Sequence, residues 1–203
     1  MKNDKKTEKM DESKYSMDTQ LIYGKDVSNK WDYSHHVTAP ISSSTTFRLD
    51  SVARGAQGFI QFAQTQKHRN EPPILIYDRL GEPNKDMLEE NLAHVESGET
   101  AVTFTSGMGA ISGVLGVLTG SGDEIITHST LYGCTISLFT NWYPKFNIDV
   151  KDIDLTLAEN ILGTVNEKTK VIYFETPANP NMDIIDIGNV RKIVDSLNES
   201  RDT

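Results

Sequence analysis

The sequence predicts an α/β fold with a mostly parallel sheet. Short apolar runs alternate with amphipathic helical segments over the second half of the chain, which is the pattern of strands joined by crossover helices. One of these runs, residues 171–174, is apolar at nearly every position, as in a strand covered on both faces. Three further segments sit where a strand gives way to a loop or a helix, and open α/β folds build their binding sites there.

The N-terminal part of the chain is expected to carry little regular structure. Residues 1–20 are polar and of mixed charge, which is typical of a disordered tail. Residues 21–82 show poor periodicity, and their run of Ser and Thr at residues 42–46 favours extended, irregular chain. We interpret residues 21–82 as an N-terminal arm, which is either a solvated loop or a segment that packs on a partner subunit.

Regular elements are expected to alternate through residues 83–203, which we take as one domain. Asn84 or Asp86 would cap its first helix, and Gly98 would end that helix. Apolar residues at helical spacing predict helices at about residues 84–97, 108–119, 132–141, 155–162 and 186–198. Apolar or β-prone runs predict strands at residues 101–105, 124–127, 146–150 and 171–174.

Composition excludes several classes of partner. The 203 residues carry a net charge of -9, whereas binding to nucleic acid requires an excess of Lys and Arg on one face. Cys134 is the only cysteine, so an intrachain disulfide is excluded and a reducing compartment is indicated. No apolar run has the length of a membrane span, and the N-terminus lacks the apolar stretch of a signal peptide. We therefore expect a cytoplasmic protein without nucleic-acid or membrane partners, and we assign no metal site.

The first candidate block, residues 105–109, is Thr-Ser-Gly-Met-Gly between a strand and an apolar helix. Backbone N–H groups at such a helix start, helped by the helix dipole, form a site suited to phosphate. A structural turn explains the block equally well. A dinucleotide-binding turn is disfavoured because the following strand closes with Thr127 and His128 where that motif needs an acidic residue.

The second and third blocks contribute candidate contacts at the same edge of the presumed sheet. In residues 131–135, Tyr132 could stack on an aromatic cofactor or donate a proton, although core packing is the simpler interpretation for Tyr132 and for Cys134. In residues 175–181, two prolines would hold Asn179 as a polar contact, although such a segment is also common turn chemistry.

Taken together, the three blocks resemble the cystathionine γ-synthase-like family of pyridoxal 5'-phosphate (PLP) enzymes of Cys and Met metabolism. The resemblance covers about residues 76–197 and, more loosely, residues 39–47. Within this family the Leu-Tyr-Gly-Cys-Thr string is most similar to methionine γ-lyases, because related members usually carry Gly where Cys134 stands. The resemblance implies the PLP type I (aspartate-aminotransferase-like) fold, of which this chain would form an N-terminal arm and an incomplete large domain.

The resemblance also implies roles around the cofactor ring and phosphate. Ser106, Gly107 and Met108 would hold the phosphate through the start of their helix. Tyr132 would stack on the pyridine ring and assist departure of the thiol, and Cys134 would line the substrate pocket.

The remaining roles fall on four residues. Asn179 would lie beside the cofactor ring, with Glu175 as polar support. Tyr77 and Arg79 match a Tyr-x-Arg pair that reaches the phosphate of a neighbouring subunit, a task that suits the forked, charged guanidinium.

Several departures from the family pattern accompany these matches. Acidic residues stand beside the Tyr-x-Arg pair at Asp78 and Glu82, and the polar stretch at residues 61–73 is longer than expected. The family's cofactor-carrying lysine and its ring-nitrogen aspartate would both fall beyond residue 203.

The implied function is a PLP-dependent carbon–sulfur lyase that acts on a small sulfur amino acid, by α,γ-elimination from methionine. The complete form would be a homo-oligomer, and the chain alone is expected to be inactive. The alternatives are a non-catalytic fragment that acts only with a complementary chain, a cystathionine γ-synthase or O-acetylhomoserine sulfhydrylase type of transferase, and, least favoured, a nucleotide-binding module.

Overall fold

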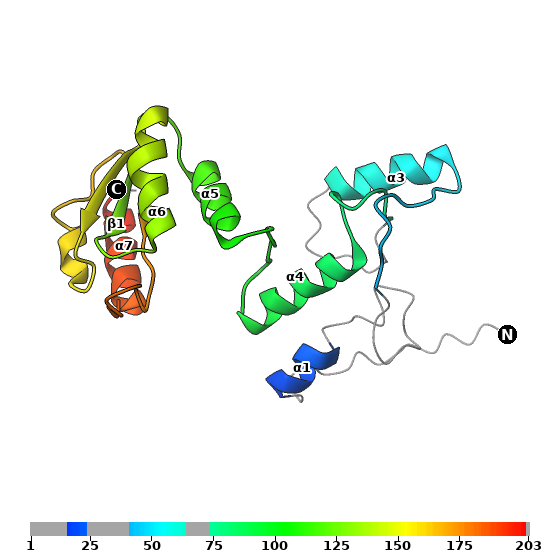
Figure 1. Ribbon diagram of the computed structural model, residues 1–203, viewed down its shortest axis with the longest axis horizontal. Helices are drawn as coiled ribbons and strands as arrows, with labels where there is room; N and C mark the ends of the chain where they lie inside the picture. Colours follow the sequence, from blue (N-terminus) through cyan, green and yellow to red (C-terminus); the bar gives the residue numbers. More distant parts are fainter. Residues whose placement is uncertain (1–15, 24–40, 64–73, 202–203) are drawn as a thin grey trace. The chain divides into compact units, whose positions relative to one another are not determined.

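The computed structural model describes residues 16–23, 41–63 and 74–201 (Figure 1). Most of the predicted tail and of the long polar stretch at residues 61–73 lies outside the described residues. The chain divides into two compact units, Met1–Thr103 and Phe104–Thr203, which we call unit 1 and unit 2 and describe separately. The helix predicted to begin the large domain belongs to unit 1.

Unit 1 contains three described helices and one isolated β-bridge. The helices are α1 (Met17–Tyr23), α3 (Val52–Ala63) and α4 (Pro83–Val95). Thr46 and Tyr77 form the antiparallel bridge. Extended chain therefore occurs around Thr46, as expected. Helix α4 confirms the helix predicted at about residues 84–97.

Helix α3 contradicts the prediction of irregular chain through residues 21–82. Its buried positions are Gly55 and Gly58, whose low helix propensity argues against a helix, although the apolar residues of this segment do recur at helical spacing. A Cβ atom at Gly58 would lie 3.0 Å from Ile74 and 3.1 Å from Ile76. The glycine thus permits a close approach of α3 to the segment before the bridge.

Helix α4 is capped by a different residue from the two that were predicted. The Glu82 side chain accepts a hydrogen bond from the Lys85 N–H at 2.7 Å, and Pro83 occupies the first turn. Asn84 instead accepts a hydrogen bond from the Ser42 N–H at 2.7 Å. The Asp86 carboxylate accepts one from the Glu82 N–H at 3.4 Å, which completes a reciprocal arrangement at the helix start.

Unit 2 is built on a three-stranded parallel sheet. Its strands are β1 (Glu124–His128), β2 (Asp149–Ile153) and β3 (Thr169–Tyr173), in the order β2-β1-β3. In the register of the pairing, Ile125 lies between Val150 and Val171. Every residue of the central strand β1 is buried, which confirms the predicted parallel α/β architecture.

Helices cover both faces of this sheet, and alternate strand residues serve two separate cores. Helix α5 (Gly107–Leu118) and α6 (Gly133–Ser137), which continues as a π-helix (Leu138–Trp142), lie on the face of Ile125. Helix α7 (Ile187–Arg201) and the 3₁₀ turn Ala158–Ile161 lie on the face of Ile172. The first core contains Leu115, Ile125, Leu131, Phe139, Tyr143 and Ile148, and the second contains Leu155, Ala158, Ile161, Ile185 and Val190.

Two predicted elements are displaced or shortened. The strand expected at residues 146–150 begins at Asp149, because a 3₁₀ helix (Tyr143–Phe146) and the left-handed residue Asn147 precede it. The helix expected at residues 155–162 is only the 3₁₀ turn, because Leu157 has extended backbone angles that no helix can run through.

Two strand predictions need correction as well. Residues 101–105 form no strand. Strand β3 is half-buried at its apolar positions and not fully covered, since within the described residues it pairs only with β1. A groove lies between β3 and α7, with apolar walls that include Val171, Phe174 and Val194.

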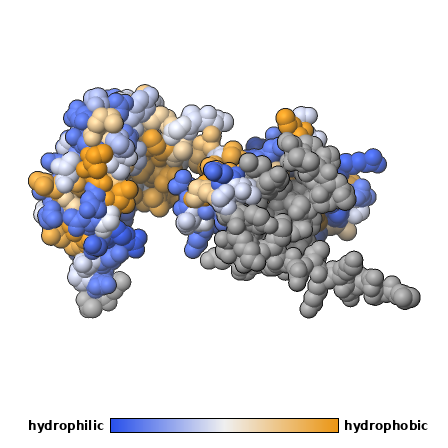
Figure 2. All heavy atoms as spheres, turned by 90° about the horizontal axis from the view of Figure 1, so that it is seen from below, coloured by the Kyte–Doolittle hydropathy of each residue, from blue (hydrophilic) through white to orange (hydrophobic). Residues whose placement is uncertain are grey.

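Apolar side chains also reach the surface of unit 2 (Figure 2). Val117 on α5 is 86 % exposed, and Ile184 before α7 is 67 % exposed. No helix in the described ranges is long and apolar enough to cross a membrane.

Candidate functional site

The three candidate blocks of unit 2 meet beyond the carboxyl ends of β1 and β3. The Thr135 hydroxyl lies 3.9 Å from the Met108 sulfur and donates a hydrogen bond to Glu175 at 3.1 Å. Thr135 is fully buried, so these contacts form the base of the site. Sequence reasoning placed Met108 and Glu175 here but did not assign Thr135, although it lies inside the second block.

The start of α5 is open to an anion. Ser106 has extended backbone angles, and its hydroxyl accepts a hydrogen bond from the Gly109 N–H at 3.0 Å, so it is the N-cap residue. The first N–H groups of a helix, here those of Gly107 and Met108, have no intrahelical acceptor. The first turn contains no acidic residue, and no heavy atom would lie within 4 Å of a Cβ at Gly107. This combination suits a phosphate group.

Tyr132 presents its ring to solvent while its backbone is fixed. Its N–H donates to a Glu175 carboxylate oxygen at 2.8 Å, and the side chain is 46 % exposed. Cys134 is also exposed, and its thiol donates to the Tyr132 hydroxyl oxygen at 3.4 Å. Core packing, the simpler interpretation of both residues, is therefore wrong.

The hydrogen bond to Cys134 raises the pKa of Tyr132 above its ordinary value. The phenol therefore stays protonated at neutral pH and can donate a proton.

Glu175 organises one wall of the site, formed with Met108, Tyr132 and Thr135, through three hydrogen bonds. Besides the Tyr132 N–H and the Thr135 hydroxyl, the Tyr173 hydroxyl donates to it at 3.1 Å. Burial, and then the negative charge of Glu175, raise the pKa of Tyr173 to about 12. Sequence analysis missed Tyr173 because it stands inside an apolar run that is typical of a buried strand.

The loop at residues 176–183 carries Asn179, which is exposed. Both X–Pro bonds of this loop, before Pro177 and Pro180, are cis. Asn181 donates to the Thr130 hydroxyl at 3.1 Å, and Asp183 contacts the His128 ring at 3.3 Å. Nothing in the sequence signalled the His128–Asp183 pair, whose members are 55 positions apart.

Tyr77 and Arg79 belong to unit 1. The Arg79 guanidinium carbon lies 5.0 Å from the centre of the Tyr77 ring, in a cation–π contact. Arg79 is exposed, and the backbone of the adjacent Asp78 is held by the Thr45 carbonyl at 3.1 Å. The two side chains therefore contact each other, and their reach to the phosphate of a neighbouring subunit stays a prediction.

A family model described as Cys/Met metabolism PLP-dependent enzyme matches residues 18–199. The chain belongs to this family.

Similar curated proteins include two L-methionine γ-lyases. That of Fusobacterium nucleatum subsp. polymorphum is 35% identical over 184 residues, which cover 91% of this chain and 44% of the relative. That of Treponema denticola is 34% identical over 180 residues, covering 89% of this chain and 42% of the relative. The chain thus spans less than half the length of these relatives.

Similar solved structures confirm the type I fold class. A putative O-acetylhomoserine (thiol)-lyase from Campylobacter jejuni, which carries N'-pyridoxyl-lysine-5'-monophosphate, matches with a TM-score of 0.75 and 26% identity over 90% of this chain and 42% of its own. Cystathionine γ-lyase from Lactobacillus plantarum, in complex with L-serine, matches with a TM-score of 0.72 and 27% identity over the same shares of the two chains.

Pyridoxal 5'-phosphate is the cofactor of this family, and the described residues fit its two ends. The phosphate would meet the free N–H groups of Gly107 and Met108 without an opposing carboxylate in the first turn. The flat ring would meet the exposed ring of Tyr132.

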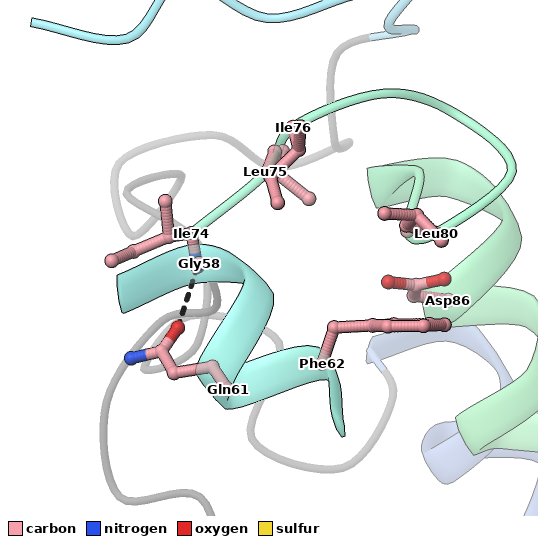
Figure 3. A pocket seen from close by; sticks show the side chains of 9 residues that line it. Gly58, Gln61, Phe62, Ile74, Leu75, Ile76, Leu80 and Asp86 are labelled. Atoms are coloured by element: carbon pink, nitrogen blue, oxygen red, sulfur yellow. Dashed lines mark hydrogen bonds between the residues drawn. The ribbon is translucent and has the colours of Figure 1, made fainter. Parts of the chain in front are cut away.

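A second hollow lies in unit 1 and contains none of the predicted site residues (Figure 3). Gln61 closes one side by accepting the Ile74 N–H at 3.0 Å, and the Asp86 carboxylate points into the space from α4. Burial is the main cause that raises the pKa of Asp86. The lining residues are Gly58, Gln61, Phe62, Ile74, Leu75, Ile76, Leu80, Gly81 and Asp86.

The hollow is small, and Gly58, Gln61 and Phe62 of α3 line one side of it, so we assign it to the packing of α3. Among the residues that the structure describes, no group of three His, Cys, Asp or Glu side chains could hold a metal ion.

Proposed function

We propose that this chain forms the phosphate- and ring-binding wall of a PLP-dependent carbon–sulfur lyase that acts on a small sulfur amino acid. Methionine is the proposed substrate and α,γ-elimination the proposed reaction. One observation carries this proposal: Glu175 holds Tyr132 and Thr135 against Met108, so the open start of α5 and the exposed Tyr132 ring share one wall.

Each residue of the wall has a chemical task. Gly107 and Met108 bind the phosphate through backbone N–H groups, and Ser106 keeps the helix start in shape. When bound, the cofactor ring supplies the sink for electrons released from the substrate. The Tyr132 hydroxyl, which stays protonated at neutral pH, donates its proton to the departing sulfur. Cys134 orients that hydroxyl through its S–H group.

A transferase that uses the same wall is the second candidate. The similar Campylobacter jejuni structure is named an O-acetylhomoserine (thiol)-lyase, and such an enzyme needs the same cofactor with a different leaving group. The choice of methionine rests on the two methionine γ-lyase relatives and on Cys134 beside Tyr132.

The cofactor part of the proposal is tested by a glycine pair on α5. Equilibrium dialysis of the 203-residue chain should show binding of pyridoxal 5'-phosphate that is roughly tenfold tighter than binding of pyridoxal, which lacks the phosphate. Gly107→Ala should abolish that difference, because the methyl group occupies the space of the anion. Gly116→Ala is the matched control, since its Cβ also meets no atom within 4 Å but lies well inside α5, away from the helix start. Equal affinities for the two ligands in the unmodified chain would refute the phosphate site.

The reaction is tested by joining this chain to the C-terminal remainder of the Fusobacterium nucleatum enzyme. Release of thiol and 2-oxo acid from methionine supports the lyase, whereas sulfhydrylation of O-acetylhomoserine supports the transferase. The chain alone, and the chain mixed with the separate C-terminal piece, show whether a complementary chain is needed.

A further inference from the structure

The loop at residues 176–183 is closed on itself and then tied to the end of β1. Within the loop, the Ala178 N–H donates to the Asp183 carbonyl at 3.0 Å, and the Met182 N–H donates back to the Ala178 carbonyl at 2.6 Å. Ala178 is fully buried, whereas the next residue, Asn179, is exposed. The loop is therefore a small rigid body, and its position depends on what anchors it.

His128 is one anchor, and its two ring nitrogens do different things. The ring is 3 % exposed at the end of β1. Nδ1 accepts a hydrogen bond from the Leu155 N–H at 3.1 Å, which requires that Nδ1 carry no proton. In the neutral ring the proton is then on Nε2, which faces the Asp183 carboxylate at 3.3 Å.

This division separates a core contact from a loop contact. Leu155 belongs to the core beneath α7, so the Nδ1 side satisfies a buried backbone group. Asp183 is 31 % exposed and closes the hydrogen-bonded turn that carries Asn179. The contact at Nε2 therefore links the loop to β1, whose position is fixed by the sheet.

We propose that His128 and Asp183 are positioning residues that fix the 176–183 loop and so hold Asn179 at the wall formed by Tyr132 and Glu175. The inference rests on the proposed function, because that function supplies the cofactor that Asn179 would contact. His128 and Asp183 themselves touch neither cofactor nor substrate.

Two amide substitutions separate the two sides of the ring. In His128→Asn the side-chain oxygen takes the place of Nδ1 and keeps the Leu155 contact, while the reach to Asp183 is lost. In His128→Gln the terminal amide takes the place of Nε2 and keeps Asp183, while the Leu155 N–H loses its acceptor. Asp183→Asn keeps an acceptor for Nε2–H, and Asp183→Ala removes it.

Hydrogen exchange of the Ala178 and Met182 amides measures directly how often the hydrogen-bonded loop opens. We expect exchange about 3- to 10-fold faster in His128→Asn and Asp183→Ala, as for loss of one hydrogen bond, and near-native exchange in Asp183→Asn and His128→Gln. Asp195→Ala is the matched control, because Asp195 is a carboxylate on α7 that pairs with Arg191 in its own helix, away from the loop. Asp183 is partly exposed, so Asp183→Ala should still fold. Unchanged exchange in this variant would overturn the proposal.

Binding of pyridoxal 5'-phosphate then distinguishes positioning from mere loop stability. Asn179→Ala and Asp183→Ala should each weaken binding several-fold, and the double variant should bind no more weakly than Asn179→Ala alone. Additive losses, or no loss in Asp183→Ala while the unmodified chain binds, would overturn the positioning role and leave the proposed function standing. Absence of binding by the unmodified chain would instead overturn the proposed function, and this inference with it.

Discussion

The two ends of the sheet in unit 2 use a carboxylate in opposite ways. At the amino end, Glu124 is 2 % exposed, and its oxygens are taken by Lys151 at 2.6 Å, Thr169 at 2.7 Å and Asn166 at 2.8 Å. At the carboxyl end, Glu175 also accepts three hydrogen bonds, but one of them comes from the backbone of Tyr132, whose ring remains exposed.

The difference separates a stabilising network from the network of the proposed site. The donors around Glu124 tie the central strand to both of its neighbours, because Lys151 lies on β2 and Thr169 on β3. Glu175 holds the backbone of Tyr132 and leaves its side chain available to a ligand. This agrees with the rule that open parallel sheets bind at the carboxyl ends of their strands.

The largest expected effect is on stability at the amino end. Glu124→Ala should lower the free energy of unfolding by about 3 kcal/mol, because three donors lose their acceptor, two of them partly or fully buried. Urea unfolding followed by circular dichroism measures this loss. Glu167→Ala, an exposed carboxylate near the same end, should change stability by less than about 0.5 kcal/mol. A loss below about 1 kcal/mol for Glu124→Ala would contradict the network.

Acid should remove the same contribution. Burial acts to raise the pKa of Glu124, but the contacts with Lys151, Thr169 and Asn166 outweigh it and lower the pKa below the ordinary 4.5. A depressed pKa stabilises the folded state above the unfolded value and loses that effect as the pH falls through the folded value. The stability advantage over Glu124→Gln should thus be constant above pH 4.5 and shrink below it, in urea titrations at several pH values. An advantage that grows on acidification would contradict this sign.

Local patterns in the sequence predicted the parts of this comparison that depend on neighbours along the chain. The apolar run at β1 and the helical spacing of α5 located both elements, and the glycine-rich block at residues 105–109 marked the helix start where we propose the phosphate site. The start of β2 was misplaced because Asn147 adopts a left-handed conformation that an apolar pattern does not show.

Contacts between distant residues could not be predicted in this way. Glu175 was assigned, but for its partners Thr135 and Tyr173 the sequence pattern predicted only that they lie in a helix and in a buried strand. The contact between His128 and Asp183 depends on the meeting of two loops, which only the folded chain brings together.

At the carboxyl end, a change in Glu175 should affect ligand binding more than stability. Glu175→Gln replaces one acceptor oxygen with a donor, so Tyr132 loses part of its anchor and affinity for pyridoxal 5'-phosphate should fall about tenfold. The free energy of unfolding should fall by only about 1 kcal/mol. Equilibrium dialysis and urea unfolding on one preparation measure both. Glu124→Gln is the matched control and should lose stability more than ligand affinity. Equal changes of affinity and stability in the two variants would contradict the distinction between the two ends of the sheet.

The smallest expected effect is on the proton of Tyr132. Cys134→Ala removes the neighbour that raises the pKa of this phenol, so the pKa should fall back toward the ordinary value of about 10 while stability stays nearly unchanged. Labelling tyrosine with ¹³C at Cζ and following the Tyr132 signal by NMR against pH measures the shift. Cys134→Ser tests the cause, because it removes the sulfur and keeps a side chain of similar size, so the pKa should fall there as well. A pKa that stays raised in both variants would mean that the exposed sulfur does not control the tyrosine, and the proposed proton donor would then need another source for its protonated state.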